Sequence, residues 1–365
     1  MPNKPGGFPL RLSGLILATV GVWACGDGVT LPQSYLTALC LELQAELISG
    51  AVKDGIPALT DPTFVAVGDA KADYLLGTDR VIGLEVAGEY IAIPHNILWW
   101  HEIVNLNDVG LAVTYCPLTG SSMVFDRGAA GGAEFGVSGL LFQNNLVMYD
   151  RSSGGVVESL WPQMLAGGRC GPGEGRALDM VPALEIEWED WVALHPDTRV
   201  VSRDTGFSRS YTRYPYGDYE IESNAYTLFR QEELDPRRPP KERVLGIPFE
   251  DGGGLAFPFG ALRDVGNLAA IHETGDGREP IVVFWDSAAS AAMAYRPSAG
   301  RRQVLTFEVR DGAFVDLETG SEWSLEGRAL SGPLAGQRLA MIPEAYVSFW
   351  FAFSTFFENP DLWLP

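Results

Sequence analysis

Cys116 is the residue of this sequence whose surroundings best suit a chemical role. It follows the apolar run LAVTY and precedes a Pro-Leu-Thr-Gly turn, so its thiol is expected where a strand ends. An imidazole and a carboxyl group lie about 15 residues earlier, and a thioether and a second imidazole are also available. Thiolate, thioether and imidazole are soft donors that favour copper over magnesium or calcium. The sequence therefore predicts a soft-metal site, with copper as the expected ion and with Cys116, His101, Met148, His95 and Glu102 as its ligands.

Two other interpretations of Cys116 stay open. In the first, Cys116 is a nucleophile that His101 activates as a base and that Glu102 or another acid orients, although no hydrolase motif surrounds the cysteine. In the second, Cys116 is a small buried apolar residue, His101 hydrogen-bonds a carbonyl and Met148 fills the core. The second interpretation predicts a non-catalytic binding or interaction module. Whether the protein is an enzyme is left open by the sequence.

The elements that must position these residues are mostly short strands. Runs such as LAVTYC, SMVFD, EFGVSGL and NLVMYD are rich in β-branched and aromatic residues. Helical periodicity is rarer: residues 35–48 form an amphipathic pattern, and residues 96–105 and 187–194 allow shorter helices. The predicted fold is mainly β (α+β), with short helices and one N-terminal helix.

Two degenerate copies of one β-rich unit are predicted from internal similarity. Residues 80–94 align with 243–258, and residues 111–127 align with 280–296 without gaps. In the second copy, the candidate ligands are replaced by residues without donor groups of that kind: Trp285 for Cys116, Val265 for His101, Gly266 for Glu102 and Phe314 for Met148. The alignment therefore predicts a site in copy one (78–205) and a scaffold in copy two (241–365), with a linker or packing strap at 206–240.

The N-terminus has the pattern of an export signal. Lys4 and Arg11 precede about 13 apolar or small residues, and Cys25 follows in a sequence similar to a bacterial lipobox. We expect cleavage of residues 1–24, lipidation of Cys25, and a body held by lipid on the periplasmic or cell-surface side of a membrane. Residues 25–77 are then a helical or extended segment. In an oxidising envelope, Cys40 and Cys170 are a candidate disulfide.

The charge of the chain excludes some classes of binding partner. The 365 residues contain 47 acidic and 26 basic side chains, a formal net charge of −21. Such a charge repels the phosphate backbone, so nucleic acid is not an expected partner. It also gives no attraction to anionic lipid, so membrane attachment rests on the lipid anchor. A protein partner cannot be named from the sequence.

The sequence also resembles the prokaryotic family called domain of unknown function 3179. The strings that carry the resemblance span nearly all of the mature chain: KDGIPALTDPTFV (53–65), RVIGLEVAGEYIAIP (80–94), ILWWHEIVN (97–105), TYCPLTGSSMVFDR (114–127), FGVSGLLFQNNLVMYDR (135–151) and PYGDYE (215–220). The resemblance implies an exported, often lipid-anchored protein and no established reaction. Members commonly have Cys-Pro-Leu-Cys where this chain has Cys116-Pro-Leu-Thr119. Thr119 argues against a dithiol redox role or a two-thiolate metal site.

Overall fold

The computed structural model describes residues 38–151, 158–229, 233–273, 278–299 and 303–365. It is 39% strand and 16% helix, which confirms the predicted mainly β fold. The predicted signal peptide, residues 1–24, and the predicted lipidation site at Cys25 lie outside the described residues. In the described part of the chain, no helix has the length and apolar character needed to cross a membrane.

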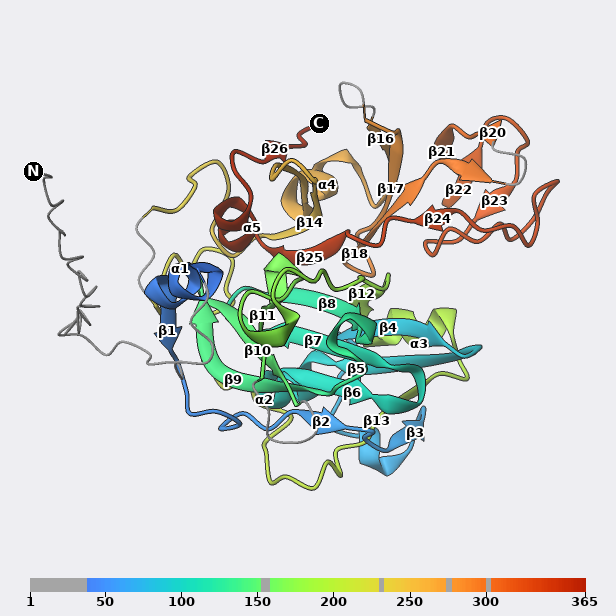
Figure 1. Cartoon of the computed structure of the whole chain (residues 1–365). Coiled ribbons are helices and arrows are strands. Elements are labelled where there is room, and N and C mark those ends of the chain that lie inside the picture. Colours follow the sequence, from blue (N-terminus) through green and yellow to red (C-terminus); the bar gives the residue numbers. More distant parts are fainter. Residues whose placement is uncertain (1–37, 152–157, 230–232, 274–277, 300–302) are drawn as a thin grey trace, which may run out of the picture.

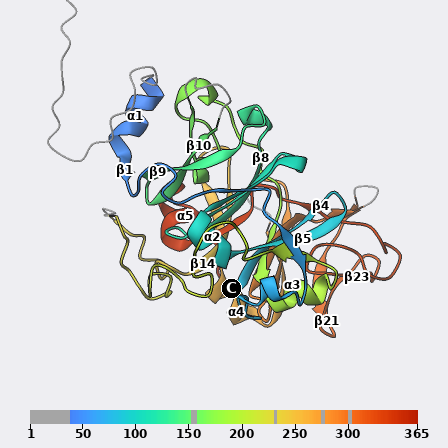
Figure 2. The same ribbon diagram turned by 90° about the horizontal axis from the view of Figure 1, so that it is seen from below.

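The N-terminal helix ends two residues before its sequence pattern does. Helix α1 covers Ala38–Glu46, and the chain continues as strand β1, Leu47–Ser49. Strand β1 pairs antiparallel with β9, Phe135–Phe142, with Leu47 opposite Phe142. Figure 2 shows α1 at the periphery of the molecule beside β1. Backbone pairing with β9 therefore overrides the helical pattern at residues 47 and 48.

Residues 38–205, here called the first lobe, contain three sheets. Their strand orders are β12-β4-β5-β13-β3, β2-β6-β7-β8 and β1-β9-β10-β11. The remaining strands are β2 Leu59–Thr60, β3 Phe64–Ala66, β4 Arg80–Val86, β5 Glu89–Pro94, β6 Ile103–Leu106, β7 Leu111–Cys116, β8 Ser121–Asp126, β10 Asn145–Asp150, β11 Leu160–Pro162, β12 Leu184–Glu187 and β13 Arg199–Val201. The α-helices are α2 His95–His101 and α3 Trp188–Leu194, and the 3-10 helices are η2 Ala70–Ala72, η3 Asn107–Val109, η4 Gly128–Ala130, η5 Gln163–Leu165 and η6 Gly171–Gly173.

Residues 241–365, the second lobe, contain three further sheets and a short hairpin. The orders are β25-β14-β15-β26, β16-β17-β18-β24, β21-β22-β23 and β19-β20. The strands are β14 Arg243–Pro248, β15 Gly254–Pro258, β16 Leu268–Glu273, β17 Ile281–Asp286, β18 Ala291–Arg296, β19 Ser298–Ala299, β20 Gln303–Val304, β21 Phe307–Arg310, β22 Ala313–Asp316, β23 Glu322–Trp323, β24 Ala340–Met341, β25 Tyr346–Phe349 and β26 Asp361–Leu362. The helices are α4 Phe259–Val265 and α5 Trp350–Phe356.

The lobes arrange these elements in a similar way. In each lobe an antiparallel hairpin (β4-β5 or β14-β15) leads into a helix, and a short strand pairs in parallel with the hairpin's second strand. Each lobe also holds a buried Asp–Trp pair: Asp150 accepts a hydrogen bond from Trp161 Nε1 at 3.0 Å, and Asp316 accepts one from Trp323 Nε1 at 2.9 Å. Equivalent hydrogen bonds thus occur at equivalent places in the two strand orders.

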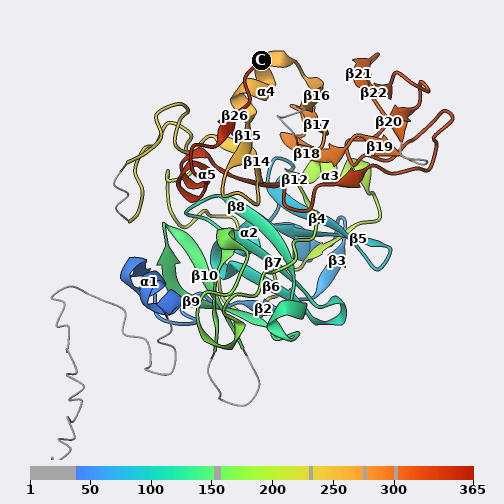
Figure 3. The ribbon, with the colours of Figure 1, turned by 45° about the horizontal axis from the view of Figure 1, so that its top comes forward.

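The lobes meet along two pairs of strands. Strand β8 lies against β25, and β12 lies against β18 (Figure 1, and Figure 3 with the top turned forward). The Phe349 amide donates to the Thr119 carbonyl at 2.8 Å. Between them, Gly120 has a φ of +60°, and a Cβ there would lie 2.8 Å from the Phe349 ring. The turn after Cys116 therefore requires glycine and is fixed against the second lobe.

The segment between the lobes packs on the same turn. The Tyr219 hydroxyl donates to the Leu118 carbonyl at 2.9 Å, and the Lys241 ammonium lies 3.8 Å from the centre of the Tyr219 ring. The Phe229 amide donates to Asn144 Oδ1 at 3.1 Å. Residues 206–229 thus cover the end of β7 where Cys116 lies.

Candidate functional site

Cys116 is the last residue of β7 and is completely buried. Its Sγ lies 3.7 Å from the Asn144 carbonyl oxygen, to which the thiol donates. Burial and the nearby Glu102 raise the pKa of the thiol to about 11, although the Thr119 and Leu118 groups favour the thiolate. Nucleophilic cysteines need the opposite environment, one that lowers the thiol pKa. The surroundings of Cys116 keep it a protonated thiol at neutral pH.

His101 ends helix α2, and both of its ring nitrogens have protein partners. Nδ1 lies 2.7 Å from the Pro57 carbonyl oxygen, and Nε2 lies 2.7 Å from the Tyr211 hydroxyl. A carbonyl oxygen can only accept, so Nδ1 carries the proton and Nε2 accepts from the tyrosine. Burial lowers the pKa of His101 to about 4. The imidazole is neutral at neutral pH and has no free nitrogen for a metal or for proton abstraction from Cys116.

Glu102 differs from the two histidines because its side chain has no hydrogen-bond partner in the described part of the chain. It is 5% exposed, and no described group hydrogen-bonds its carboxyl. Burial raises its pKa to about 8, so the carboxyl is mainly protonated at pH 7. Its φ of +56° ends α2 and turns the chain into β6. The helix predicted over 96–105 therefore stops at His101, because residues 103–106 pair with β7 instead.

His95 lies at the other end of α2, in a different environment. Its Nε2 is 3.6 Å from Glu185 Oε2, and its ring stacks on Tyr115 with 4.1 Å between ring centres. Arg80 Nε donates to Glu185 at 2.6 Å, and Arg243 approaches the same carboxylate from the second lobe at 3.6 Å. Although burial opposes ionisation, Arg80 and its neighbours lower the pKa of Glu185 to about 2. Burial lowers the pKa of His95 to about 3, so it is a neutral member of a buried ionic network.

The predicted ligand set is therefore not assembled. Met148, on β10, is buried in the same apolar cluster as Cys116, opposite Val137 and Trp161 on the neighbouring strands. In the described part of the chain, three or more His, Cys, Asp or Glu ligand atoms come within 4.8 Å of one another only at Glu187, Glu189 and Asp190. His95 and His101 are separated because they occupy opposite ends of one helix. A two-residue pair, Cys116 with Glu102, is what remains of the predicted set.

Thr119 is held in a buried polar network that the sequence analysis did not identify. Its Oγ1 lies 2.9 Å from Ser121 Oγ, and Asn145 Nδ2 donates to it at 2.9 Å. Gln163 joins the network by accepting from Ser121 at 2.6 Å and donating to Thr114 at 2.8 Å. The Thr119 hydroxyl thus has a structural role beside Cys116, in a network whose members are spread over 50 residues of sequence.

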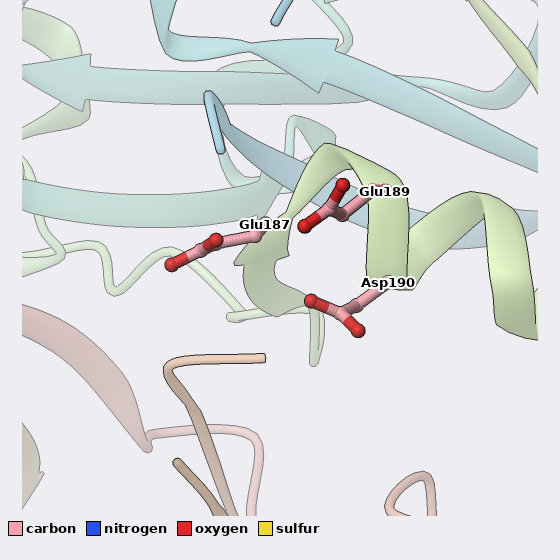
Figure 4. Close-up of side chains that lie close together, drawn as sticks. All are labelled: Glu187, Glu189 and Asp190. Atoms are coloured by element: carbon pink, nitrogen blue, oxygen red, sulfur yellow. The ribbon is translucent and has the colours of Figure 1, made fainter. Parts of the chain in front are cut away.

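Three carboxylates lie close together at the start of α3 (Figure 4). Glu187 is the residue before the helix, and Glu189 and Asp190 are in its first turn. Acidic side chains at this position stabilise the helix through its dipole. No further observation points to a bound cation, so this cluster is explained by the helix.

A groove lies between the two lobes, and we call it the interlobe groove. Its volume is about 1460 Å³. The first lobe contributes Met123 and residues within 164–180. The second lobe contributes Arg296 and residues within 247–255, 342–346 and 356–364, together with 273 and 278–281 on either side of residues 274–277, which are outside the described chain. Because its two walls are far apart in the sequence, no local motif could reveal it. The groove exists only after the lobes have packed together.

Cys40 and Cys170 form a disulfide between α1 and the segment that follows β11, with 4.8 Å between the two Cα atoms. Their sequence separation of 130 residues means that the bond fixes the N-terminal helix to the first lobe. Cys116 is the free cysteine of the described chain. The disulfide is consistent with an oxidising compartment.

Comparison with known proteins gives a family and no characterised relative. The model of a family described as a protein of unknown function (DUF3179) matches residues 53–360. No curated protein and no solved structure matches the chain. Since the matched region includes most of both lobes, the chain belongs to the DUF3179 family.

Proposed function

We propose that this protein is an exported, lipid-anchored binding protein that holds its ligand non-covalently in the interlobe groove. The observation that carries the proposal is the groove itself, at about 1460 Å³ and lined by both lobes. Ligand sites occur preferentially at such junctions, where two packed units leave a concave surface. Apolar side chains line much of it, including Ile247, Leu255 and Ile342.

The state of the predicted catalytic groups favours binding over catalysis. Cys116 is a buried thiol whose pKa is raised to about 11, and both nitrogens of His101 are occupied. A nucleophilic cysteine needs a neighbouring base or cation that stabilises its thiolate. Here burial and the carboxyl of Glu102 both raise the pKa of the thiol and so make the thiolate less favourable.

Export and anchoring enter the proposal from the sequence of residues 1–25. The Cys40–Cys170 disulfide supports an oxidising location. The body would then be held by lipid on the periplasmic or cell-surface side of the membrane. The formal net charge of the full chain is −21, and loss of Lys4 and Arg11 with residues 1–24 makes it −23, so the body has no electrostatic attraction to anionic lipid. The similar strand orders of the lobes support an origin by duplication, and the groove would form where the two copies meet.

The proposal is tested by titrating the purified protein with Nile red, a neutral dye whose emission rises in apolar sites. Leu255 lines the groove, so Leu255→Trp adds bulk there and should weaken dye binding at least about tenfold. Leu330 is 62% exposed and lies outside the groove, which makes Leu330→Trp the matched control. Cys116→Ala should bind like the parent. Equal binding by the Leu255 and Leu330 variants would refute the groove as the site.

A second candidate is a copper site at Cys116 and Glu102. The observation that favours it is the buried Glu102 carboxyl, which has no described hydrogen-bond partner and lies near a soft thiol. A metal would displace the protons of both groups. Elemental analysis of the parent, Cys116→Ala and Glu102→Gln tests this candidate: stoichiometric copper in the parent and loss in both variants supports it, and equal copper in all three refutes it.

A further inference from the structure

We infer that the ligand of the interlobe groove is a peptide segment that carries both apolar and basic side chains. This inference rests on the proposed binding function and adds the chemical class of the ligand. Two features of the groove carry it: its size and the charge of its rim.

The size of the groove favours a peptide over a small molecule. Pockets for drug-sized ligands measure about 300–1,000 Å³. The interlobe groove is larger, at about 1460 Å³, and its apolar surface comes from both lobes, with Met164 and Met180 on one side and Leu255 and Ile342 on the other. Methionine side chains adapt to ligands of irregular shape, which suits a segment with several apolar side chains.

The rim of the groove is negatively charged. Seven acidic and three basic side chains line it, an excess of four negative charges. Three of the acids pair with arginines of the rim: Asp251 and Asp361 with Arg278, and Glu279 with Arg296. The other four, Asp179, Glu250, Glu273 and Glu344, have no ion pair or side-chain hydrogen bond with the described part of the chain. These four carboxylates are available to the basic groups of a ligand.

One cationic side chain of the protein, Arg278, is already bound at this surface. The Arg278 guanidinium lies 3.6 Å from the centre of the Phe249 ring, and its nitrogens are 3.7 Å from Asp251 and 3.4 Å from Asp361. An aromatic face and two carboxylates thus hold one guanidinium at the rim. A ligand lysine or arginine at the same rim would meet the carboxylate of Glu250, which has no ion pair within the described part of the chain.

The test uses three labelled eight-residue peptides that alternate leucine with lysine, glutamine or glutamate. Fluorescence anisotropy should give the order Lys, then Gln, then Glu, and binding of the Lys peptide should weaken as salt rises. The double variant Glu250→Lys/Glu344→Lys should bind the Lys peptide about tenfold more weakly and the Glu peptide more tightly. Asp197→Lys/Asp218→Lys changes net charge equally at exposed positions outside the groove and should bind like the parent.

The outcomes separate this inference from the function on which it rests. If the three peptides bind equally and Leu255→Trp weakens the binding of all of them, the groove binds peptides but does not prefer basic ones. If no peptide binds while Nile red still does, the ligand is not a peptide and the groove remains a binding site. If neither the peptides nor the dye bind, both the inference and the proposed function are refuted. Equal losses of affinity for the Lys peptide in the Glu250/Glu344 and Asp197/Asp218 variants would show that the net charge of the protein, rather than the rim of the groove, determines affinity.

Discussion

Glu102 should make the protein less stable as pH rises, and Glu102→Gln should remove this dependence. In the unfolded chain the carboxyl has its usual pKa of 4.5, whereas in the folded protein burial raises its pKa to about 8. Between these values the folded state binds one more proton than the unfolded state, so the free energy of unfolding falls as pH increases. The fall is about 1.4 kcal/mol for each pH unit in this window.

Summed over that window, ionisation of Glu102 costs the folded state about 4 kcal/mol by pH 8, of which about 3 kcal/mol is present at pH 7. Because Glu102 is 5% exposed, solvent screening reduces this little. Glutamine has nearly the same shape and no charge, so the variant should match the parent near pH 4.5 and exceed its stability increasingly up to pH 8.

Urea unfolding of the parent and Glu102→Gln at pH 5, 6, 7 and 8 measures the difference. The exposed Glu42 provides the control, since Glu42→Gln should follow the parent at every pH. Parallel pH dependences for the parent and Glu102→Gln would refute the reasoning, because they would mean that the folded carboxyl ionises as easily as the unfolded one.

Three further predictions concern the surroundings of Cys116 and the disulfide. The pKa of Cys116 is about 11 instead of its usual 9.0, so iodoacetamide at pH 7 should modify the folded protein at least about 100-fold more slowly than the urea-unfolded protein. Mass spectrometry of the peptide that contains Cys116 follows the modification. Comparable rates would restore the interpretation of Cys116 as a nucleophile. Tyr219→Phe removes the hydrogen bond to the Leu118 carbonyl and should lower the free energy of unfolding by about 1 kcal/mol. Tyr226 is exposed, so Tyr226→Phe should leave the free energy of unfolding unchanged. Equal effects of the two substitutions would argue against the Tyr219 hydrogen bond. Replacing Cys40 and Cys170 by serine opens a 130-residue loop and should lower the free energy of unfolding in urea by about 4 kcal/mol. Reduction of the parent should have the same effect. An unchanged free energy of unfolding in both cases would mean that the disulfide does not form.

Local sequence patterns were sufficient to predict the strands around the candidate site. The run LAVTYC forms β7, and Cys116 ends that strand as expected. Alternation and β-branched content determine such strands locally. The helix predicted over 96–105 was wrong after His101, because pairing of residues 103–106 with β7 decides their conformation. Helical pattern is a weaker determinant than the backbone pairing available in the folded chain.

The candidate ligands could not be evaluated from sequence because their partners are distant. His101 is bound by Pro57 and Tyr211, which lie 44 and 110 residues away. His95 belongs to an ionic network that includes Arg243 of the second lobe through Glu185. The interlobe groove depends entirely on how the lobes pack. Residue type alone therefore suggested a metal set, and tertiary contacts assign these histidines to structural roles.

Hydrogen exchange of the parent with and without the Leu-Lys peptide tests the interlobe groove most directly. Binding in the groove predicts slower exchange on both walls, in residues 164–180 of the first lobe and in 247–255 and 342–346 of the second, with no change around Cys116 and Glu102. Slower exchange on one wall alone, or around Cys116 instead, would contradict a ligand held between the lobes.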